Sequence, residues 1–193
     1  MVRIINLFCL CSLSIFLATC SPVSSIVSIA ANAGISSKGF AASVDDSFIK
    51  AKIIGKISSL KLSNLSDITV SVSLGEVLLT GYASNQVNRL QIVENVWEVD
   101  GVTNIYNEIQ ISSSVKLSER TEDAVFESRL MTRLLFKSGI NSNNYSLDVV
   151  GGTVYAIGLA ENLDEKTKIE DFLSNMPDIP KLVTIINIKK LKD

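Results

Sequence analysis

Two pairs of adjacent carboxylates are the residues of this chain whose types and spacing suit acid and base chemistry best. They are Asp45-Asp46 and Glu122-Asp123. Each pair stands where a helix is expected to begin, and negative charge there offsets the helix dipole and caps free N–H groups. The chain has no histidine, which removes the commonest general base and metal ligand. Capping therefore explains these acids better than catalysis, and we expect no enzyme, cofactor or metal site.

A thiol is the next reactive group, and it lies in the run Leu17-Ala18-Thr19-Cys20. The mostly apolar stretch before it has the layout of a secretory signal peptide, and it is shorter than the roughly 20 apolar residues of a spanning helix. Leucine, two small residues and cysteine resemble a bacterial lipobox. That resemblance implies cleavage before Cys20 and attachment of lipid to its thiol. The alternative is a secreted protein that is cut near Ala18 and keeps a free thiol.

Removal of this leader would also remove Cys9 and Cys11, so we expect no intramolecular disulfide. Ser21 follows the cysteine, and together with the lipobox it suggests delivery to the outer membrane. The chain carries 18 basic and 20 acidic side chains, and this near balance argues against binding to nucleic acid. Residues 21–42 are rich in Ser and Ala and are interpreted as a spacer, with an apolar stretch lying against the membrane as the alternative.

The sequence contains two copies of one pattern. A shift of 77 positions places residues 75–83 on residues 152–160, and both segments read as glycine, strand, glycine and a small residue. The same shift aligns apolar residues spaced by four, which is typical of an amphipathic helix. These residues are Ile49, Ile53 and Ile57 in the first copy and Phe126, Leu130 and Leu134 in the second.

Each copy is predicted to run helix, strand, tight turn, strand, helix, strand. The turns at 74–76 and 151–152 contain glycine, which tolerates positive φ, and the strands before them alternate apolar and polar residues, as half-buried strands do. We expect the second helices over 85–98 and 161–175, the last strands over 103–111 and 181–191, and Val87, Leu90, Val93 and Val96 against the first sheet. Trp97 is expected to pack inside a unit or between units, with an exposed contact as the alternative.

When two strands of one sheet are joined by a helix, the helix forms a crossover connection and the two strands run parallel. The predicted fold class is therefore α+β, with two tandem αββαβ two-layer sandwiches, each with a three-stranded mixed sheet. The Gly-x-Val-x-Leu-x-Gly hairpin and the segment 99–109 resemble BON domains. With the lipobox and spacer ahead of them, the layout is similar to that of dual-BON outer-membrane lipoproteins associated with division sites and envelope integrity.

The resemblance implies a division of the whole chain and a location. The expected parts are a signal peptide (1–19), a lipidated N-terminus and spacer (20–43), a first BON domain (44–112), a linker (113–118) and a second BON domain (119–193). The protein would be anchored by lipid in the outer membrane, facing the periplasm. It would support the integrity of the envelope and would not be an enzyme.

Members of this family are thought to bind phospholipid through the first helix of the second domain, which implies a site on residues 122–137 here. With the apolar stripe of that helix against the sheet, Val125, Arg129 and Arg133 share another face. An apolar residue followed by two arginines suits an anionic membrane surface, where each basic group contributes about 1 kcal/mol. The predicted phospholipid-binding residues are Val125, Arg129, Met131, Arg133 and Lys137.

Two alternatives remain open for this helix. Arg129 and Arg133 would be ordinary solvated residues if they pair with Glu122 and Glu127. The surfaces of both domains would serve protein partners instead if the protein is an interaction module, for example for outer-membrane assembly proteins or a stress-response complex.

Overall fold

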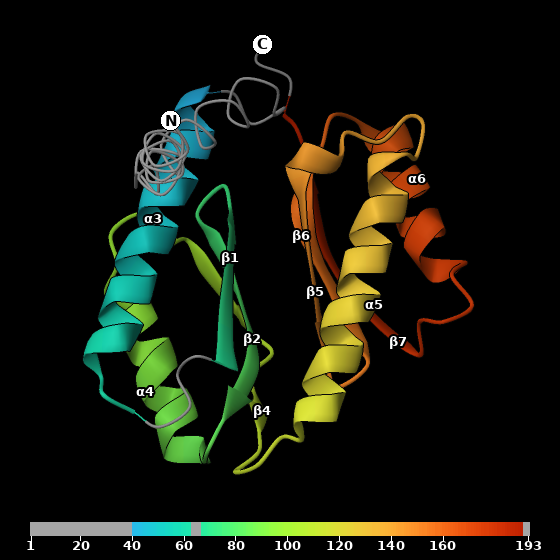
Figure 1. Cartoon of the computed structure of the whole chain (residues 1–193). Coiled ribbons are helices and arrows are strands. Elements are labelled where there is room, and N and C mark those ends of the chain that lie inside the picture. Colours follow the sequence, from blue (N-terminus) through green and yellow to red (C-terminus); the bar gives the residue numbers. More distant parts are fainter. Residues whose placement is uncertain (1–39, 63–66, 191–193) are drawn as a thin grey trace, which may run out of the picture.

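The computed structural model describes residues 40–62 and 67–190, and the predicted leader, Cys20 and nearly all of the spacer lie outside these ranges. Two units of one α+β topology follow each other, so the predicted fold class is confirmed (Figure 1). The first unit comprises α3 (Phe40–Ser59), β1 (Ile68–Ser73), β2 (Glu76–Ala83), α4 (Gln86–Trp97), β3 (Asn104–Asn107) and β4 (Gln110–Ile111). The second comprises α5 (Leu117–Leu135), the 3-10 turn η2 (Ser142–Asn144), β5 (Tyr145–Val150), β6 (Thr153–Ala160), α6 (Leu163–Ser174) and β7 (Lys181–Ile188). Among these helices, none is both long and apolar enough to cross a membrane.

A hairpin forms the centre of each unit. β1 pairs antiparallel with β2, and β5 pairs in the same way with β6. The turn residues Leu74 and Gly75 have φ angles of 55° and 78°, and Gly151 and Gly152 have φ angles of 57° and 72°. Two successive residues with positive φ match the tight turn that follows the twist of its strands. β2 and β6 then pair in parallel with the last strand of their own unit, which completes the expected mixed sheets.

The last strand of the first unit is interrupted, whereas a continuous strand was predicted. Its two parts, β3 and β4, both pair with β2. Between them, the side-chain oxygen of Asn107 accepts a hydrogen bond from the N–H of Ile109 at 3.3 Å, and Ile109 is buried in the core. The equivalent Asn187 instead donates to Glu76 of the first domain at 2.6 Å, and β7 runs without a break.

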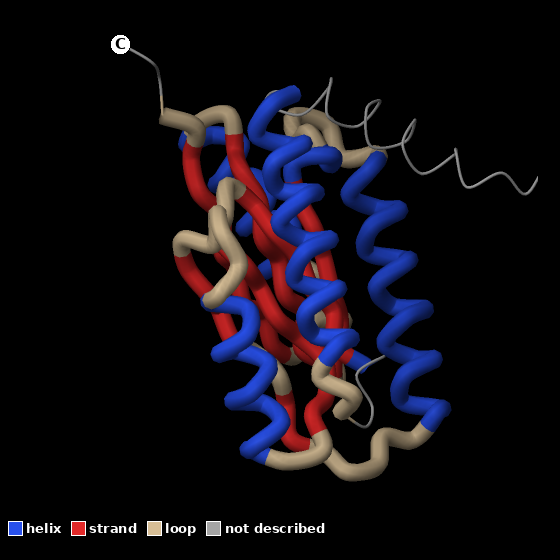
Figure 2. Tube along the Cα trace, turned by 90° about the vertical axis from the view of Figure 1, so that its left-hand side faces the viewer, coloured by secondary structure: helices blue, strands red, loops and turns tan. Residues whose placement is uncertain are grey.

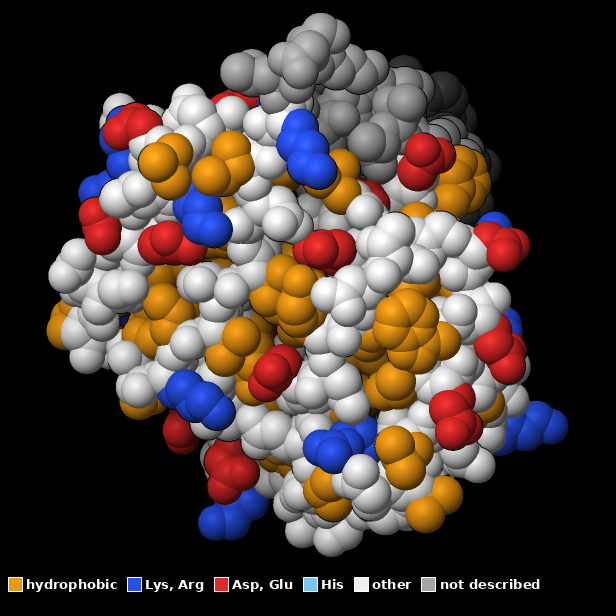
Figure 3. Space-filling view, turned by 180° about the vertical axis from the view of Figure 1, so that it is seen from behind, with side chains coloured by type: hydrophobic (Ala, Val, Ile, Leu, Met, Phe, Trp, Pro, Cys, Tyr) orange, Lys and Arg blue, Asp and Glu red, His pale blue; other side chains and the backbone are white. Residues whose placement is uncertain are grey.

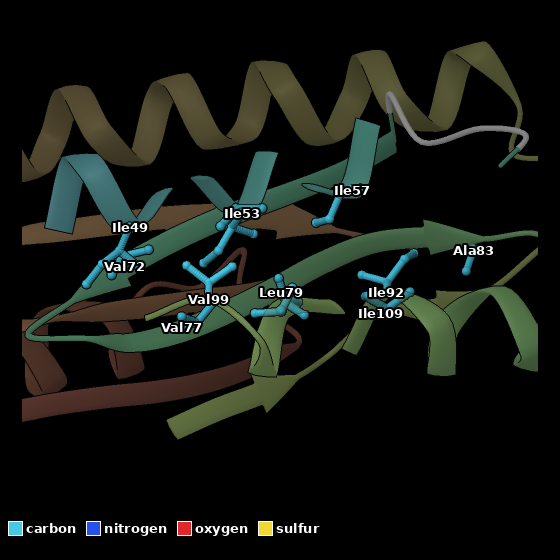
Figure 4. Packing of buried hydrophobic residues seen from close by; sticks show 12 residues of the cluster. Ile49, Ile53, Ile57, Val72, Val77, Leu79, Ala83, Ile92, Val99 and Ile109 are labelled. Atoms are coloured by element: carbon cyan, nitrogen blue, oxygen red, sulfur yellow. The ribbon is translucent and has the colours of Figure 1, made fainter. Parts of the chain in front are cut away.

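The two sheets face each other, and the helices lie outside them, so the molecule has four layers (Figures 1 and 2). On one face of the first sheet, Val77 and Leu79 pack beneath α3 and α4 (Figure 4). On its other face, Leu78 packs with Tyr155 and Ile157 of the second domain. The prediction of half-buried strands is wrong, because each domain covers the sheet face that would otherwise meet solvent.

Polar contacts also join the domains. The Thr80 hydroxyl donates a hydrogen bond to Asp148, and the side-chain amide of Gln110 donates to the carbonyl of Val150 at 3.3 Å. Arg120 on α5 forms a two-pronged ion pair with Asp67, just before β1, with one N···O distance of 2.7 Å. The domains are therefore held by an apolar centre and by polar bonds around it.

Helix α4 turns a different face to the sheet from the predicted one. Ile92 and Val96 are buried, whereas Val87 and Leu90 are 63% and 49% exposed. The helix carries two apolar stripes, and the predicted one mixed residues from both. Trp97 is 51% exposed at the end of α4, so the expectation that it packs inside the protein is wrong.

Candidate functional site

The paired acids have a structural task that differs from the predicted one. Asp46 and Asp123 lie well inside α3 and α5 instead of at the start of a helix. The Asp46 carboxylate accepts hydrogen bonds from the N–H groups of Leu74 and Gly75 at 2.9 and 3.0 Å, and Asp123 accepts from the turn at 151–152 at 2.8 and 3.0 Å. The capping prediction is wrong, because these carboxylates satisfy the N–H groups that a tight hairpin turn leaves without partners.

Helix α5 presents its predicted apolar stripe to the core. Leu130 and Leu134 are fully buried, and Phe126 packs against the same cluster. The helix begins at Leu117 and ends at Leu135, so it starts earlier and stops earlier than the predicted range of 122–137.

The opposite side of α5 carries three of the predicted lipid-binding residues. Val125 is 53% exposed, and Arg129 and Arg133 are exposed on the same side of the helix. A shallow depression of about 420 Å³ lies beside Val125 and is lined by Arg120, Thr121, Ala124, Val125 and Ser128. An exposed apolar residue and two cations thus share one solvent-facing surface.

The pairing of these arginines with nearby acids is not seen. Neither Arg129 nor Arg133 forms an ion pair within the described ranges, and one Arg133 nitrogen lies 3.9 Å from the sulfur of Met176. Glu127 points the other way, toward β5, where its carboxylate accepts a hydrogen bond from the N–H of Val149 at 3.2 Å. The two guanidinium groups therefore keep their charge available to a ligand.

The other two predicted residues lie elsewhere. Met131 is partly buried and packs against the core of the second domain, so it does not belong to the exposed face. Lys137 follows the end of α5, and its ammonium lies 5.6 Å from the centre of the Phe172 ring. The surface that the structure brings together consists of Val125, Arg129 and Arg133, and we call it the α5 face.

A cleft of about 340 Å³ between the domains gathers carboxylates beneath the inner side of α5. Its charged lining comprises Asp67, Arg120, Asp123, Glu127 and Asp148. The pKa of Glu127 is raised from its ordinary 4.5 to about 7, mainly by burial and then by the charge of Asp148, and the hydrogen bond from Val149 opposes the rise. Raised carboxyl pKa values occur at catalytic sites and also in structural clusters.

The chemistry of this cleft is that of a domain contact. Asp67 is paired with Arg120, Asp123 binds the hairpin turn, and Asp148 accepts from Thr80. In the part of the chain that the structure describes, no group of three or more acidic or thiol side chains is arranged to hold a metal ion. We therefore assign the cleft a role in joining the domains.

Reasoning from the sequence missed a second surface, in the first domain. Phe48 on α3 is 64% exposed and borders a depression of about 540 Å³. The signal was present, because the shift of 77 positions that aligns the two copies places Phe48 on Val125.

Comparison with protein-family models agrees with the duplicated topology. Residues 45–113 and 122–189 each match the family model of the BON domain. The chain is 30% identical over 150 residues to a protein of Anaplasma centrale named "Uncharacterized protein in gshII 5'region", covering 77% of this chain and 98% of that protein. It is 23% identical over 145 residues to a 21 kDa hemolysin of Actinobacillus pleuropneumoniae, covering 75% and 74% of the two chains. Among solved structures it is similar to CdsD, a structural protein of the type III secretion system of Chlamydia trachomatis, at 12% identity and a TM-score of 0.29, covering 72% of this chain and 91% of that one.

Proposed function

The chain belongs to the BON domain family, with one domain in each half, and from this we propose that it is a non-enzymatic envelope protein that binds anionic phospholipid through the α5 face. It is anchored by lipid on Cys20 in the outer membrane, faces the periplasm and supports the integrity of that membrane. This proposal joins the family, the predicted lipobox and the properties of one exposed surface.

The observation that carries the proposal is the unpaired state of the α5 face. Arg129 and Arg133 are exposed and lack an acidic partner among the described residues, and Val125 beside them is 53% exposed. Each basic group near an anionic surface contributes about 1 kcal/mol, and the attraction falls off within a Debye length. Two arginines alone bind weakly, so a lipid anchor that holds them close to the bilayer would make the contact effective.

Vesicle sedimentation tests the lipid contact without the anchor. The chain from residue 20 onward contains every described residue, and a Cys20→Ser change removes the thiol that would be lipidated. We expect this protein to sediment with vesicles that contain phosphatidylglycerol and to be released by salt. Arg129→Glu combined with Arg133→Glu should abolish retention.

A matched control uses two exposed lysines at the ends of the last strand region, Lys181 and Lys190. Their double change to Glu alters the net charge equally and should leave most of the binding in place. Equal losses in both double variants would refute a specific role of the α5 face. The anchor is tested separately by mass spectrometry of the mature N-terminus, which should begin with an acylated Cys20.

A protein-interaction module is the second candidate, because one observation favours it. The outer stripe of α4 exposes Val87, Leu90 and Trp97. Seen from behind, hydrophobic side chains form separate patches among charged ones (Figure 3). If the stripe binds a protein such as an outer-membrane assembly factor, crosslinking in intact cells should recover a stoichiometric partner that is lost with Trp97→Ala and kept with Arg129→Glu.

A further inference from the structure

Helix α3 repeats the chemistry of the α5 face in the first domain. The shift of 77 positions places Phe48 on Val125, Lys52 on Arg129 and Lys56 on Arg133. The first-domain copy therefore has a large aromatic ring where the second has valine. Aromatic rings contribute more than valine to membrane-interface binding because they combine large area with a stiff shape.

A depression gives this surface its form. It measures about 540 Å³ and lies between α3, the β1–β2 turn and the loop that leads from α4 to β3. Phe48 and Leu74 border it and are 64% and 42% exposed. Phe48 projects from helix α3, and Leu74 belongs to the hairpin turn that Asp46 holds by two hydrogen bonds.

The charges around the depression are mixed in sign. Lys52, Asp45 and Asp100 line it, all three are exposed, and none forms an ion pair within the described ranges. Lys56, one turn further along, is already paired with Glu98. A purely anionic headgroup would meet two free carboxylates here, so it does not fit as it fits the α5 face. A group that carries a phosphate and an ammonium together is complementary to this set.

We propose that this depression, the α3 surface, binds the zwitterionic headgroup of phosphatidylethanolamine at a bilayer surface. Lys52 attracts the phosphate, the carboxylates of Asp45 and Asp100 accept hydrogen bonds from the primary ammonium, and Phe48 and Leu74 enter the boundary between headgroups and acyl chains. The α3 surface thus recognises a different lipid class from the α5 face and does so in the other domain.

The position of the surface agrees with this task. It lies toward the end of the molecule at which α3 begins, where the described chain comes nearest in sequence to Cys20 (Figure 1). Twenty residue steps separate Cys20 from Phe40, and at roughly 3.5 Å per step they reach at most about 70 Å. This orientation rests on the proposed anchor, whereas headgroup recognition does not.

Three kinds of vesicle separate the relevant headgroups. Phosphatidylcholine alone has a quaternary ammonium without N–H donors, mixtures with phosphatidylethanolamine add those donors, and mixtures with phosphatidylglycerol supply an anion without ammonium. We expect the Cys20→Ser chain from residue 20 onward to be retained several-fold better by phosphatidylethanolamine vesicles than by phosphatidylcholine alone. Phe48→Ser should reduce this retention about tenfold, since full burial of a Phe side chain corresponds to at least that factor.

The charge variants test recognition of the ammonium. Asp45→Asn combined with Asp100→Asn should remove the preference for phosphatidylethanolamine over phosphatidylcholine and leave the fold intact by circular dichroism. Val125→Ser, at the equivalent position of the second domain, should not change that preference. Arg129→Glu with Arg133→Glu should affect only the phosphatidylglycerol arm, so failure of the α5 proposal and failure of this one give different results.

Insertion has an independent readout in fluorescence. A Phe48→Trp probe in a Trp97→Phe background should shift its emission to the blue with phosphatidylethanolamine vesicles. Equal retention by phosphatidylethanolamine and phosphatidylcholine vesicles, or an unshifted emission of the Phe48→Trp probe in the presence of phosphatidylethanolamine vesicles, would overturn the proposal.

Discussion

Replacing Glu127 by glutamine should stabilise the protein above neutral pH and leave it nearly unchanged at pH 5. In the folded chain Glu127 lies on the inner side of α5 beside Asp148, and its pKa rises from 4.5 to about 7. The folded state therefore holds a proton that the unfolded chain releases. The stabilisation of the folded state by protonated Glu127 is fully present below pH 4.5 and is lost as the pH rises through about 7.

The magnitude follows from the size of the shift. Each pKa unit corresponds to about 1.4 kcal/mol, so a rise from 4.5 to about 7 sets an upper limit of roughly 3 kcal/mol for a fully buried group. Glu127 is partly open to solvent, and screening reduces this to about 1 to 2 kcal/mol. Glutamine keeps an oxygen that accepts from the N–H of Val149, so the change removes the charge and preserves that hydrogen bond.

Urea unfolding followed by circular dichroism at pH 5 and pH 8 measures the effect. The stability difference between Glu127→Gln and the wild type should grow in favour of the variant by about 1 to 2 kcal/mol between these pH values. Glu122→Gln is the matched control, because Glu122 lies exposed on the same helix, and its profile should follow the wild type. Parallel profiles for Glu127→Gln and the wild type would refute the reasoning.

Three further predictions concern stability. Asp123→Ala should lower the free energy of unfolding in urea by about 2 to 3 kcal/mol, because it leaves the turn N–H groups of Gly151 and Gly152 without their charged acceptor. A loss no greater than that of Asp45→Ala would show that Asp123 does not stabilise the turn. A double-mutant cycle of Arg120→Ala and Asp67→Ala should give a coupling of about 1 kcal/mol, discounted because Arg120 is 40% exposed; additive losses would show that the ion pair does not hold the domains. Gly81→Ala should prevent stable folding, because the φ angle of Gly81 is 101° and an added Cβ would lie 1.7 Å from the carbonyl oxygen of Asp67. Gly55→Ala in α3 is the control. Its added Cβ would meet no atom within 4 Å, and the change should raise the melting temperature through a stability gain of up to about 1 kcal/mol.

The internal repeat accounts for what could be predicted of the fold. A single shift of 77 positions aligned both hairpins and both first helices, and the core residues Ile53 and Leu130 lie where it placed them. Local patterns of spacing determine such elements, because an amphipathic helix and a glycine turn are each specified within a few residues.

The packing of one domain on the other could not be predicted in the same way. The prediction of a half-buried strand leaves its alternating polar residues, such as Ser71 and Ser73, facing solvent. In the structure both of these side chains are buried, and so is Thr80 on the neighbouring strand. Small hydroxyl side chains suit either environment, so alternation alone does not distinguish solvent from a second sheet. The same ambiguity affected Asp123, whose type suits a helix start and a hairpin turn equally well.

The candidate site was predicted in part. Exposure of Val125, Arg129 and Arg133 followed from the position of the apolar stripe, and the structure agrees. Lipid binding by these residues stays a prediction. The burial of Met131 was missed because it lies at the margin of that stripe, where tertiary packing decides which way a side chain turns.

The contact between the sheets predicts how the protein behaves when its chain is cleaved between the two domains. The covalent connection between β4 and α5 is only residues 112–116, whereas Leu78, Tyr155, Ile157 and Ile185 form a shared apolar layer. The two domains are thus held together by this apolar layer as well as by the covalent connection. A protease cut within the connection should leave two fragments that migrate together in native gel filtration and separate only in denaturant. Either half expressed alone would expose its share of that layer and should pair with a second copy of itself.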